Sequence, residues 1–97
     1  MSIAHLRTYT INKGMLDDWL ELFPKLVPVM EEAGITVEST WVNVEHSQFI
    51  WIRSYGDSVD NIEKCEAAFY GSDWWVANVD HVRSHLAHRD IVQIETA

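Results

Sequence analysis

The sequence is short of the residues that build several common kinds of site and segment. It has one cysteine, Cys65, which excludes an internal disulfide, and no cysteine spacing indicates a metal site. Its four scattered glycines cannot form a phosphate-binding loop or a dinucleotide-binding motif. No apolar run approaches the roughly 20 residues that cross a bilayer. The first residues, Met1 to His5, lack the pattern of a signal peptide. We therefore expect no cofactor and a reducing compartment, the cytoplasm.

Positive charge is also scarce. Seven basic residues stand against fifteen acidic ones, which gives a formal net charge of −8. Nucleic-acid binding depends on clustered Lys and Arg that neutralise phosphates, and an anionic membrane surface would repel such a chain. We expect neither a nucleic acid nor a membrane as a partner.

What is present is typical of one small globular domain, which we expect to cover residues 1–97. The composition is 47% hydrophobic and 23% charged. Five tryptophans are many for a chain of 97 residues, whose core is thin. A tryptophan is rarely hidden completely in so small a monomer, so several are expected to line a pocket or an interface. Trp19 and Trp75 fall on helical apolar stripes and are expected in the core.

The hydrophobic periodicity predicts alternating strands and helices. The expected strands are residues 3–11, 35–44, 48–55 and 90–95. One helix is expected over residues 15–33, with a kink or break at Pro24 and Pro28, and a second is expected in two pieces divided at Gly71 and Ser72. The order β-α-β-β-α-β predicts an α+β, ferredoxin-like fold, in which helices cover one face of a four-stranded antiparallel sheet.

Side chains alternate between the two faces of each central strand. In the first strand His5, Arg7 and Tyr9 share one face; in the third strand Phe49, Trp51, Arg53 and Tyr55 share one face. We expect the aliphatic residues of these strands to face the helices. The mixed aromatic and cationic set would then lie on the helix-free face, and a second copy of the chain would cover it. This predicts a homodimer with a small-molecule pocket on that sheet face.

Three stretches resemble the NIPSNAP family, within the dimeric α+β barrel superfamily. They are residues 6–11 (LRTYTI), 49–55 (FIWIRSY) and 67–74 (AAFYGSDW), and the likeness covers roughly residues 3–95. The resemblance implies a dimeric barrel and marks six signature positions: Arg7, Tyr9, Trp51, Arg53, Tyr55 and Trp74. Relatives in the superfamily include cofactor-free monooxygenases, isomerases, polyketide-type cyclases and haem-degrading enzymes.

The candidate catalytic residues are His5, Arg53 and Tyr55. His5 would act as a general base, Arg53 together with Arg7 would stabilise a developing enolate or carboxylate, and Tyr55 or Tyr9 would act as a donor. The candidate substrate-binding residues are Arg7, Tyr9, Trp41, Trp51, Trp74 and His81. Alternatively, Arg7 and Arg53 form only structural ion pairs, with Glu95 as a candidate partner.

His81 and His85 are four residues apart, a spacing that lets two imidazoles on a helix bind one metal ion. No H-E-x-x-H pattern accompanies them, and we expect no metal. The leading hypothesis is a cofactor-independent enzyme that acts by proton transfer on a small aromatic or polyketide-like carbonyl compound, as an isomerase, cyclase or monooxygenase. The alternatives are a non-catalytic dimer that binds a small molecule or a protein, and a haem-binding protein with an axial histidine.

Overall fold

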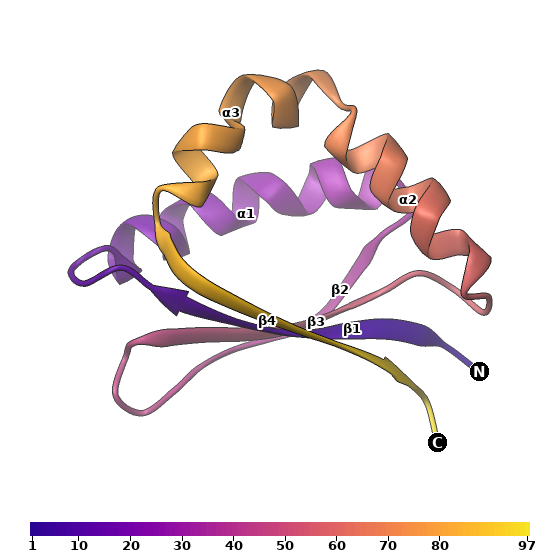
Figure 1. The fold of residues 1–97 in the computed structure, drawn as a ribbon, viewed down its shortest axis with the longest axis horizontal. Helices are drawn as coiled ribbons and strands as arrows, with labels where there is room; N and C mark the ends of the chain where they lie inside the picture. Colours follow the sequence, from indigo (N-terminus) through magenta and orange to yellow (C-terminus); the bar gives the residue numbers. More distant parts are fainter.

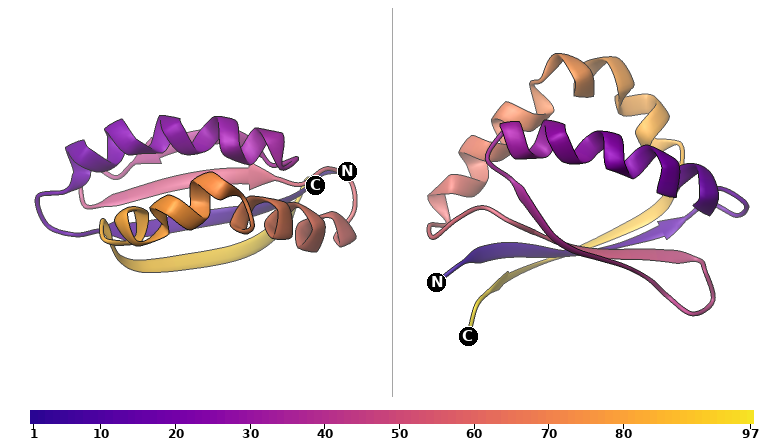
Figure 2. Two further views of the ribbon diagram at one scale, coloured as in Figure 1. Left: turned by 90° about the horizontal axis from the view of Figure 1, so that it is seen from above. Right: turned by 180° about the vertical axis from the view of Figure 1, so that it is seen from behind.

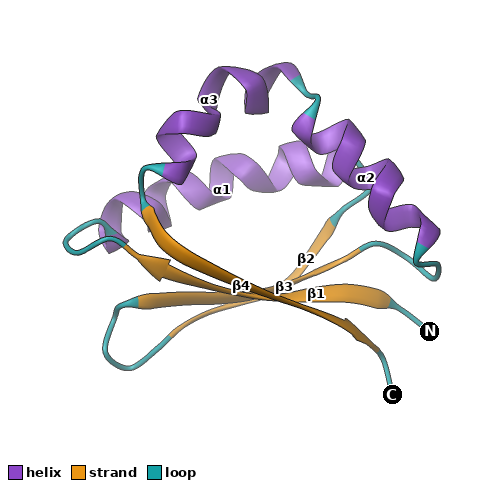
Figure 3. Cartoon of the chain, viewed as in Figure 1, coloured by secondary structure: helices purple, strands orange, loops and turns teal.

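The computed structural model describes residues 1–97 as one antiparallel sheet with three helices on one side (Figure 1). The elements are β1 (Ile3–Ile11), α1 (Leu16–Glu32), β2 (Thr36–Val42), β3 (Gln48–Ser54), α2 (Asp60–Tyr70), α3 (Asp73–Arg83) and β4 (Leu86–Glu95). The strand order is β2-β3-β1-β4, so β1 and β3 are the central neighbours. The predicted ferredoxin-like α+β fold, with its last helix in two pieces, is confirmed (Figure 3).

Helix α1 forms because apolar residues recur at helical spacing and its first turn carries Asp17 and Asp18 near the positive end of the helix dipole. Trp19 and Met30, each 1% exposed, belong to its buried stripe. Of the kink or break predicted at Pro24 and Pro28, the break does not occur, because the helix runs through both prolines. Both prolines are exposed, so water can bind the carbonyls that lose their helical N–H partners.

The hairpin between β2 and β3 is antiparallel, as predicted. The Oδ1 atom of Asn43 accepts hydrogen bonds from the backbone N–H groups of Ser47 and Gln48, both at 2.8 Å, and holds the turn closed. Strand β4 is longer than predicted, since it begins at Leu86 instead of residue 90. None of the helices is both long enough and apolar enough to cross a bilayer.

The two faces of the sheet are used the other way round from the prediction. His5, Arg7 and Tyr9 on β1 are buried, whereas Leu6 and Thr8 between them are only half-buried on the helix-free face. Alternation shows which residues share a face, and it does not show which face is covered. The space between sheet and helices is filled by large rings, and the aromatic face of the sheet supplies about half of them, Tyr9, Phe49, Trp51 and Tyr55.

The helices divide the sheet between them. Seen from above in Figure 2, α1 lies over the half that contains β2 and β3, and α2 and α3 lie over the half that contains β1 and β4. The core lies between these layers, where Trp19 and Phe23 of α1 contact Phe49 of β3 with ring centroids 5.8 and 4.7 Å away. The candidate site lies between the central strands β1 and β3 and the line along which α1 meets α2 and α3.

Candidate functional site between the sheet and the helices

Two arginines are buried under the helices on the central strands. Arg53 lies opposite His5 in the β1–β3 register, and Arg7 lies opposite Trp51. Each guanidinium belongs to a residue that is only 2% exposed. One carboxylate accompanies them, that of Glu66 on α2, whose Oε2 atom is 3.0 Å from Arg53 Nη2 and 3.6 Å from Arg7 Nη2. The cluster therefore contains two positive charges and one negative charge.

A directed chain of hydrogen bonds links the arginines through His5 and Tyr55. Arg53 Nε donates to Tyr55 Oη at 2.7 Å, and Tyr55 Oη lies 2.9 Å from His5 Nδ1. Arg7 Nη2 also lies 3.2 Å from His5 Nδ1. Because a guanidinium only donates, Nδ1 must be the unprotonated ring nitrogen, and Tyr55 donates its own proton to it.

The electrostatics of the cluster maintain these protonation states. Burial, followed by the charges of Arg7 and Arg53, lowers the pKa of His5 from 6.5 to about 4. Burial also raises the pKa of the Tyr55 hydroxyl above its usual value, although the nearby charge of Arg53 opposes this shift. His5 is therefore neutral and Tyr55 keeps its proton at neutral pH.

Two further tyrosines accept hydrogen bonds from the arginines. Tyr9 Oη accepts from Arg7 Nη1 at 2.9 Å, and Tyr70 Oη accepts from Arg53 Nη2 at 3.2 Å. Neither hydroxyl donates to a protein acceptor, so each keeps a proton that it can give to a ligand.

A cavity of about 30 Å³ adjoins this cluster. It is lined by Tyr9, Trp19, Phe23, Leu26, Met30, Trp51, Arg53, Phe69, Tyr70, Trp75, Val82, Arg83, Leu86 and Arg89. One water molecule needs roughly 10–15 Å³ of cavity volume, so this cavity accommodates about two waters. The predicted pocket thus lies on the helix-covered side of the sheet, and the expected position on the helix-free face is wrong.

The buried side-chain atoms that lack a hydrogen-bond partner are all donors. They are Nε of Arg7 and the indole Nε1 atoms of Trp19 and Trp51, and both tryptophans line the cavity. A buried donor without a partner costs about 1–3 kcal/mol. Together with the two tyrosine hydroxyls, these atoms make the site rich in donors. Its chemistry suits a ligand that brings acceptor oxygens or negative charge.

The structure brings most of the sequence-predicted site residues together. His5, Arg7, Tyr9, Trp51, Arg53 and Tyr55 all belong to the cluster or the cavity wall. The guanidinium carbon of Arg53 lies 5.6 Å from the ring centroid of Trp51, a distance at which a cation interacts with an aromatic face.

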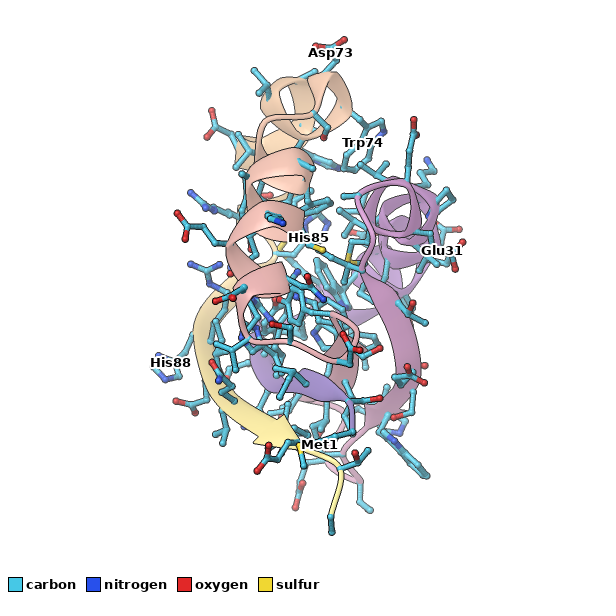
Figure 4. The ribbon with its side chains drawn as sticks, turned by 90° about the vertical axis from the view of Figure 1, so that its right-hand side faces the viewer. Met1, Glu31, Asp73, Trp74, His85 and His88 are labelled. Atoms are coloured by element: carbon cyan, nitrogen blue, oxygen red, sulfur yellow. The ribbon has the colours of Figure 1, made fainter.

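Three predicted substrate-binding residues lie elsewhere. Trp41 is 64% exposed and pairs in register with Ile50, so it lies on the helix-free face. Trp74 lies at the far side of the helical layer, where it lines a surface groove with Val29 of α1 (Figure 4). His81 is exposed on α3 and lines a separate groove.

The predicted histidine pair is close but incomplete as a metal site. The rings of His81 and His85 have centroids 5.0 Å apart, and His85 lies just beyond the end of α3. No third His, Cys, Asp or Glu joins them. His85 Nδ1 lies 2.8 Å from the backbone oxygen of His81, so its proton is used within the chain.

Sequence reasoning missed Glu66, Tyr70, Arg83 and Arg89 as members of the site. Glu66, and not the expected Glu95, pairs with the arginines; Glu95 is exposed at the end of β4, opposite Ile3. Glu66 and Tyr70 are four residues apart on α2 and hence on one helix face, which was the available signal. The positions of Arg83 and Arg89 depend on the packing of α3 and β4, which no sequence spacing reveals.

Comparisons with known proteins concern the fold. Neither a protein-family model nor a curated protein matches the amino-acid sequence. A NIPSNAP family protein from Agrobacterium tumefaciens is similar in structure, with a TM-score of 0.88 and 15% identity over 100% of this chain and 94% of that chain. An uncharacterized NIPSNAP domain protein from Burkholderia xenovorans has a TM-score of 0.85 and 15% identity over 98% and 94% of the two chains.

A cofactor-independent oxygenase, SnoaB from Streptomyces nogalater, shares the same arrangement of strands and helices. Its TM-score is 0.75 at 8% identity, over 98% of this chain and 92% of that chain. At such identities the likeness shows the fold alone. The chain has the fold of the NIPSNAP proteins of known structure, the family that its sequence motifs resemble.

Proposed function

We propose that the protein is a cofactor-independent enzyme that acts by proton transfer on a small aromatic or polyketide-like carbonyl compound in the cavity beside Arg53. The observation that carries this proposal is the excess of donors and positive charge around a cavity with aromatic walls. Isomerisation, cyclisation and oxygenation through a substrate carbanion all begin with the same step. SnoaB, which shares the fold, is described as a cofactor-independent oxygenase and is consistent with this class.

The proposed step is removal of a proton from the carbon next to the carbonyl group. The C–H bond breaks, its electron pair moves into an enolate, and the negative charge develops on the carbonyl oxygen. Arg53 and the hydroxyls of Tyr9 and Tyr70 are donors for that oxygen. Donors fixed in advance in a site without bulk water stabilise such a charge strongly. The aromatic walls, including Trp51, would surround the carbonyl end of the substrate, which is the part that a cavity of about 30 Å³ admits.

Two residues are candidates for the base. His5 is neutral, but its Nδ1 lone pair already accepts from Arg7 and Tyr55, and a pKa of about 4 makes it a weak base. Glu66 is 26% exposed and lines an open groove beside Tyr70, which also lines the cavity. The two arginines hold Oε2 of Glu66, whereas no hydrogen bond or ion pair involves its Oε1 atom, so we assign proton removal to Oε1 of Glu66 and the orientation of Tyr55 to His5. The variants His5→Asn and Glu66→Gln distinguish this assignment from the sequence-based expectation of a His5 base, because loss of the base should cause the larger loss of α-proton exchange.

The experiment measures exchange of α-protons for deuterium in small aryl ketones by proton NMR. We expect the protein to accelerate exchange, and Tyr70→Phe, which removes one donor and no charge, to slow it by about tenfold to 100-fold. Arg53→Met should abolish it, whereas Lys64→Met removes an exposed charge from the same half of the molecule and should leave it unchanged. Circular dichroism confirms that each variant is folded. Binding of the ketone without any accelerated exchange would contradict the enzymatic proposal.

A non-catalytic binding protein is the second candidate function. The observation in its favour is that the arginines are already bound to Glu66 and Tyr55, and that the cavity is only about 30 Å³. In that case Arg53→Met would lower the melting temperature and the affinity for ligand, and no variant would alter exchange.

We also propose that the protein is a homodimer joined through its helix-free sheet face. The larger apolar residues of this face are Leu6, Trp41, Ile50, Ile52, Val92 and Ile94. Trp41 and Val92 are 64% and 55% exposed. A contiguous apolar sheet face of this kind is typical of an interface, and the same face of a second copy is complementary to it. The proposal includes a cytoplasmic location and no nucleic-acid partner, for which the single thiol and the acidic composition are the support.

A further inference from the structure

We propose that the substrate carries, besides its reacting carbonyl oxygen, a second and permanently ionised group, a carboxylate, which binds between Arg83 and Arg89 at the mouth of the cavity. This inference rests on the proposed function, because it assigns the substrate class of the same site. It depends on where the chain places its positive charges.

All four arginines of the chain belong to this one region. Arg7 and Arg53 are buried in the cluster, and Arg83 of α3 and Arg89 of β4 line the cavity and are exposed. The three lysines, Lys13, Lys25 and Lys64, do not line it. In a chain with a net charge of −8, this concentration gives the cavity a local charge opposite to that of the whole molecule.

Neither arginine at the mouth has a carboxylate partner. The ion pairs of the protein join Arg7 and Arg53 to Glu66, and His88 to Asp90. Arg83 and Arg89 thus have no acidic residue within 4.0 Å, although the chain has fifteen. Their charges are free for a ligand.

The two side chains are also placed at the cavity by their own elements. Arg89 lies opposite Tyr9 in the β1–β4 register, and Tyr9 lines the cavity. The guanidinium carbon of Arg83 lies 5.7 Å from the ring centroid of Trp75, which lines it too. The helix dipole alone could explain an arginine at the C-terminal end of α3. It does not explain why the side chain of Arg83 contacts Trp75 in the cavity wall.

The mouth suits a carboxylate better than a dianion such as a phosphate ester. Arg83 is the last residue of α3, so the negative end of that helix dipole lies nearby and partly offsets the arginine charges. The cavity is otherwise lined mostly by apolar residues, with Trp75, Val82 and Leu86 among them. The geometry points to a compound with an oxygen at one end, an apolar or aromatic middle and a carboxylate at the other end. Only its inner oxygen fits the cavity as it stands, and the exposed side chains of Arg83 and Arg89 must move to admit the remainder.

The test compares para- and meta-acetylbenzoate with the matching acetylbenzamides, which keep the ketone and lose the charge. Isothermal titration calorimetry on the full chain should show that at least one acid binds about tenfold more tightly than its amide, or about 1.4 kcal/mol. Arg83→Gln/Arg89→Gln should remove this difference, and Arg83→Lys/Arg89→Lys should keep most of it. The control is Lys13→Gln/Lys64→Gln, which removes the same charge from exposed positions away from the cavity and should change nothing.

Equal affinities for acid and amide would overturn the inference, as would a preference that persists in the double glutamine variant or a failure of both acids to bind. The α-proton exchange assay separates this outcome from failure of the enzymatic proposal. Exchange of the neutral amides with no preference for the acids would leave the enzyme and remove the carboxylate subsite. Preferential binding of the acids without exchange would leave the subsite and remove the enzyme.

Discussion

At the scale of single residues, the site is defined by two buried guanidinium groups that share one carboxylate. Removing a charge from water costs several kcal/mol unless partners replace the lost hydration. For Arg53 these partners are Glu66, Tyr55 and Tyr70, together with the ring of Trp51. The cluster still has one positive charge in excess, which adds to the effect of burial in keeping His5 from taking up a proton.

His5 should make the stability of the protein depend on pH. Its pKa is about 4 in the folded protein and 6.5 in an unfolded chain, so the unfolded state binds the proton first as the pH falls. Stability is therefore present above about pH 6.5 and is lost as the pH falls toward 4. Between about pH 8 and pH 5, protonation of this histidine in the unfolded chain should lower the free energy of unfolding by roughly 2 kcal/mol.

The measurement is urea denaturation of the wild type and of His5→Asn at both pH values. The variant lacks the titrating group, so its stability should fall by roughly 2 kcal/mol less than that of the wild type. Equal losses in both proteins would show that His5 is protonated as readily in the folded state as in the unfolded chain.

At the scale of elements, the junction between α2 and α3 determines how these two helices pack on the sheet. Phe69 and Tyr70 of α2 and Trp75, Val82 and Arg83 of α3 line the cavity, so the angle between the two helices sets its shape. Gly71 allows the chain to turn tightly, because a Cβ atom there would lie 2.8 Å from the carbonyl oxygen of Ala67. Ser72 then starts α3: its hydroxyl accepts from Trp75 N at 3.2 Å and donates to Phe69 O at 2.7 Å.

Ser72→Ala should therefore destabilise the protein by about 1 kcal/mol, the usual effect of losing an N-terminal cap. Ser72→Asp, which can still accept from the backbone of the first turn, should recover most of this loss. Ser84→Ala is the matched control, since that exposed serine donates to His81 O near the other end of α3 and accepts no backbone N–H. Thermal or urea unfolding measures all three, and a Ser72→Ala protein as stable as the wild type would contradict the role of the cap.

At the scale of the whole molecule, the sheet separates two different surfaces. The helices cover one face of the sheet and leave the other face free (Figures 1 and 2). The covered face holds the charged cluster, and the helix-free face carries Leu6, Ile50 and Ile52 on the central strands. Nothing within the chain covers Trp41. A second copy packed on this face would bury it without touching the cavity, so assembly and ligand binding should be separable.

Ile50→Lys tests this separation, because Ile50 lies between Thr8 and Trp41 in the register of the helix-free face. Light scattering should show a dimer for the wild type, and the variant should dissociate with a dissociation constant raised at least roughly 30-fold, the effect of losing an interface hot spot. Val44→Lys makes a similar change in the hairpin loop, where the side chain is 94% exposed, and should remain dimeric. A wild-type protein that is monomeric at micromolar concentration would refute the dimer.

Much of the fold could be predicted from the sequence, because the residues that begin and end its helices and strands act locally. The first strand has the predicted bounds, and the division of the last helix at Gly71 and Ser72 follows from turn and capping chemistry. The break expected at Pro24 and Pro28 did not occur, because local preference was overridden by burial of Trp19, Phe23 and Met30 along one side of the helix. Local preference is a weaker force than a buried apolar stripe.

The sequence by itself determined that His5, Arg7 and Tyr9 share one face of a central strand, and that Arg53 and Trp51 share the matching face of its neighbour. The period of two residues in a strand requires this whatever else the chain does. Only the tertiary structure decided that the helices cover this face, because alternation is symmetric and the choice depends on which side chains fill the space beneath the helices. Packing likewise brought Glu66, Tyr70, Arg83 and Arg89 to the cavity, because their distances from Arg53 depend on how helices and edge strand pack and on no spacing along the chain.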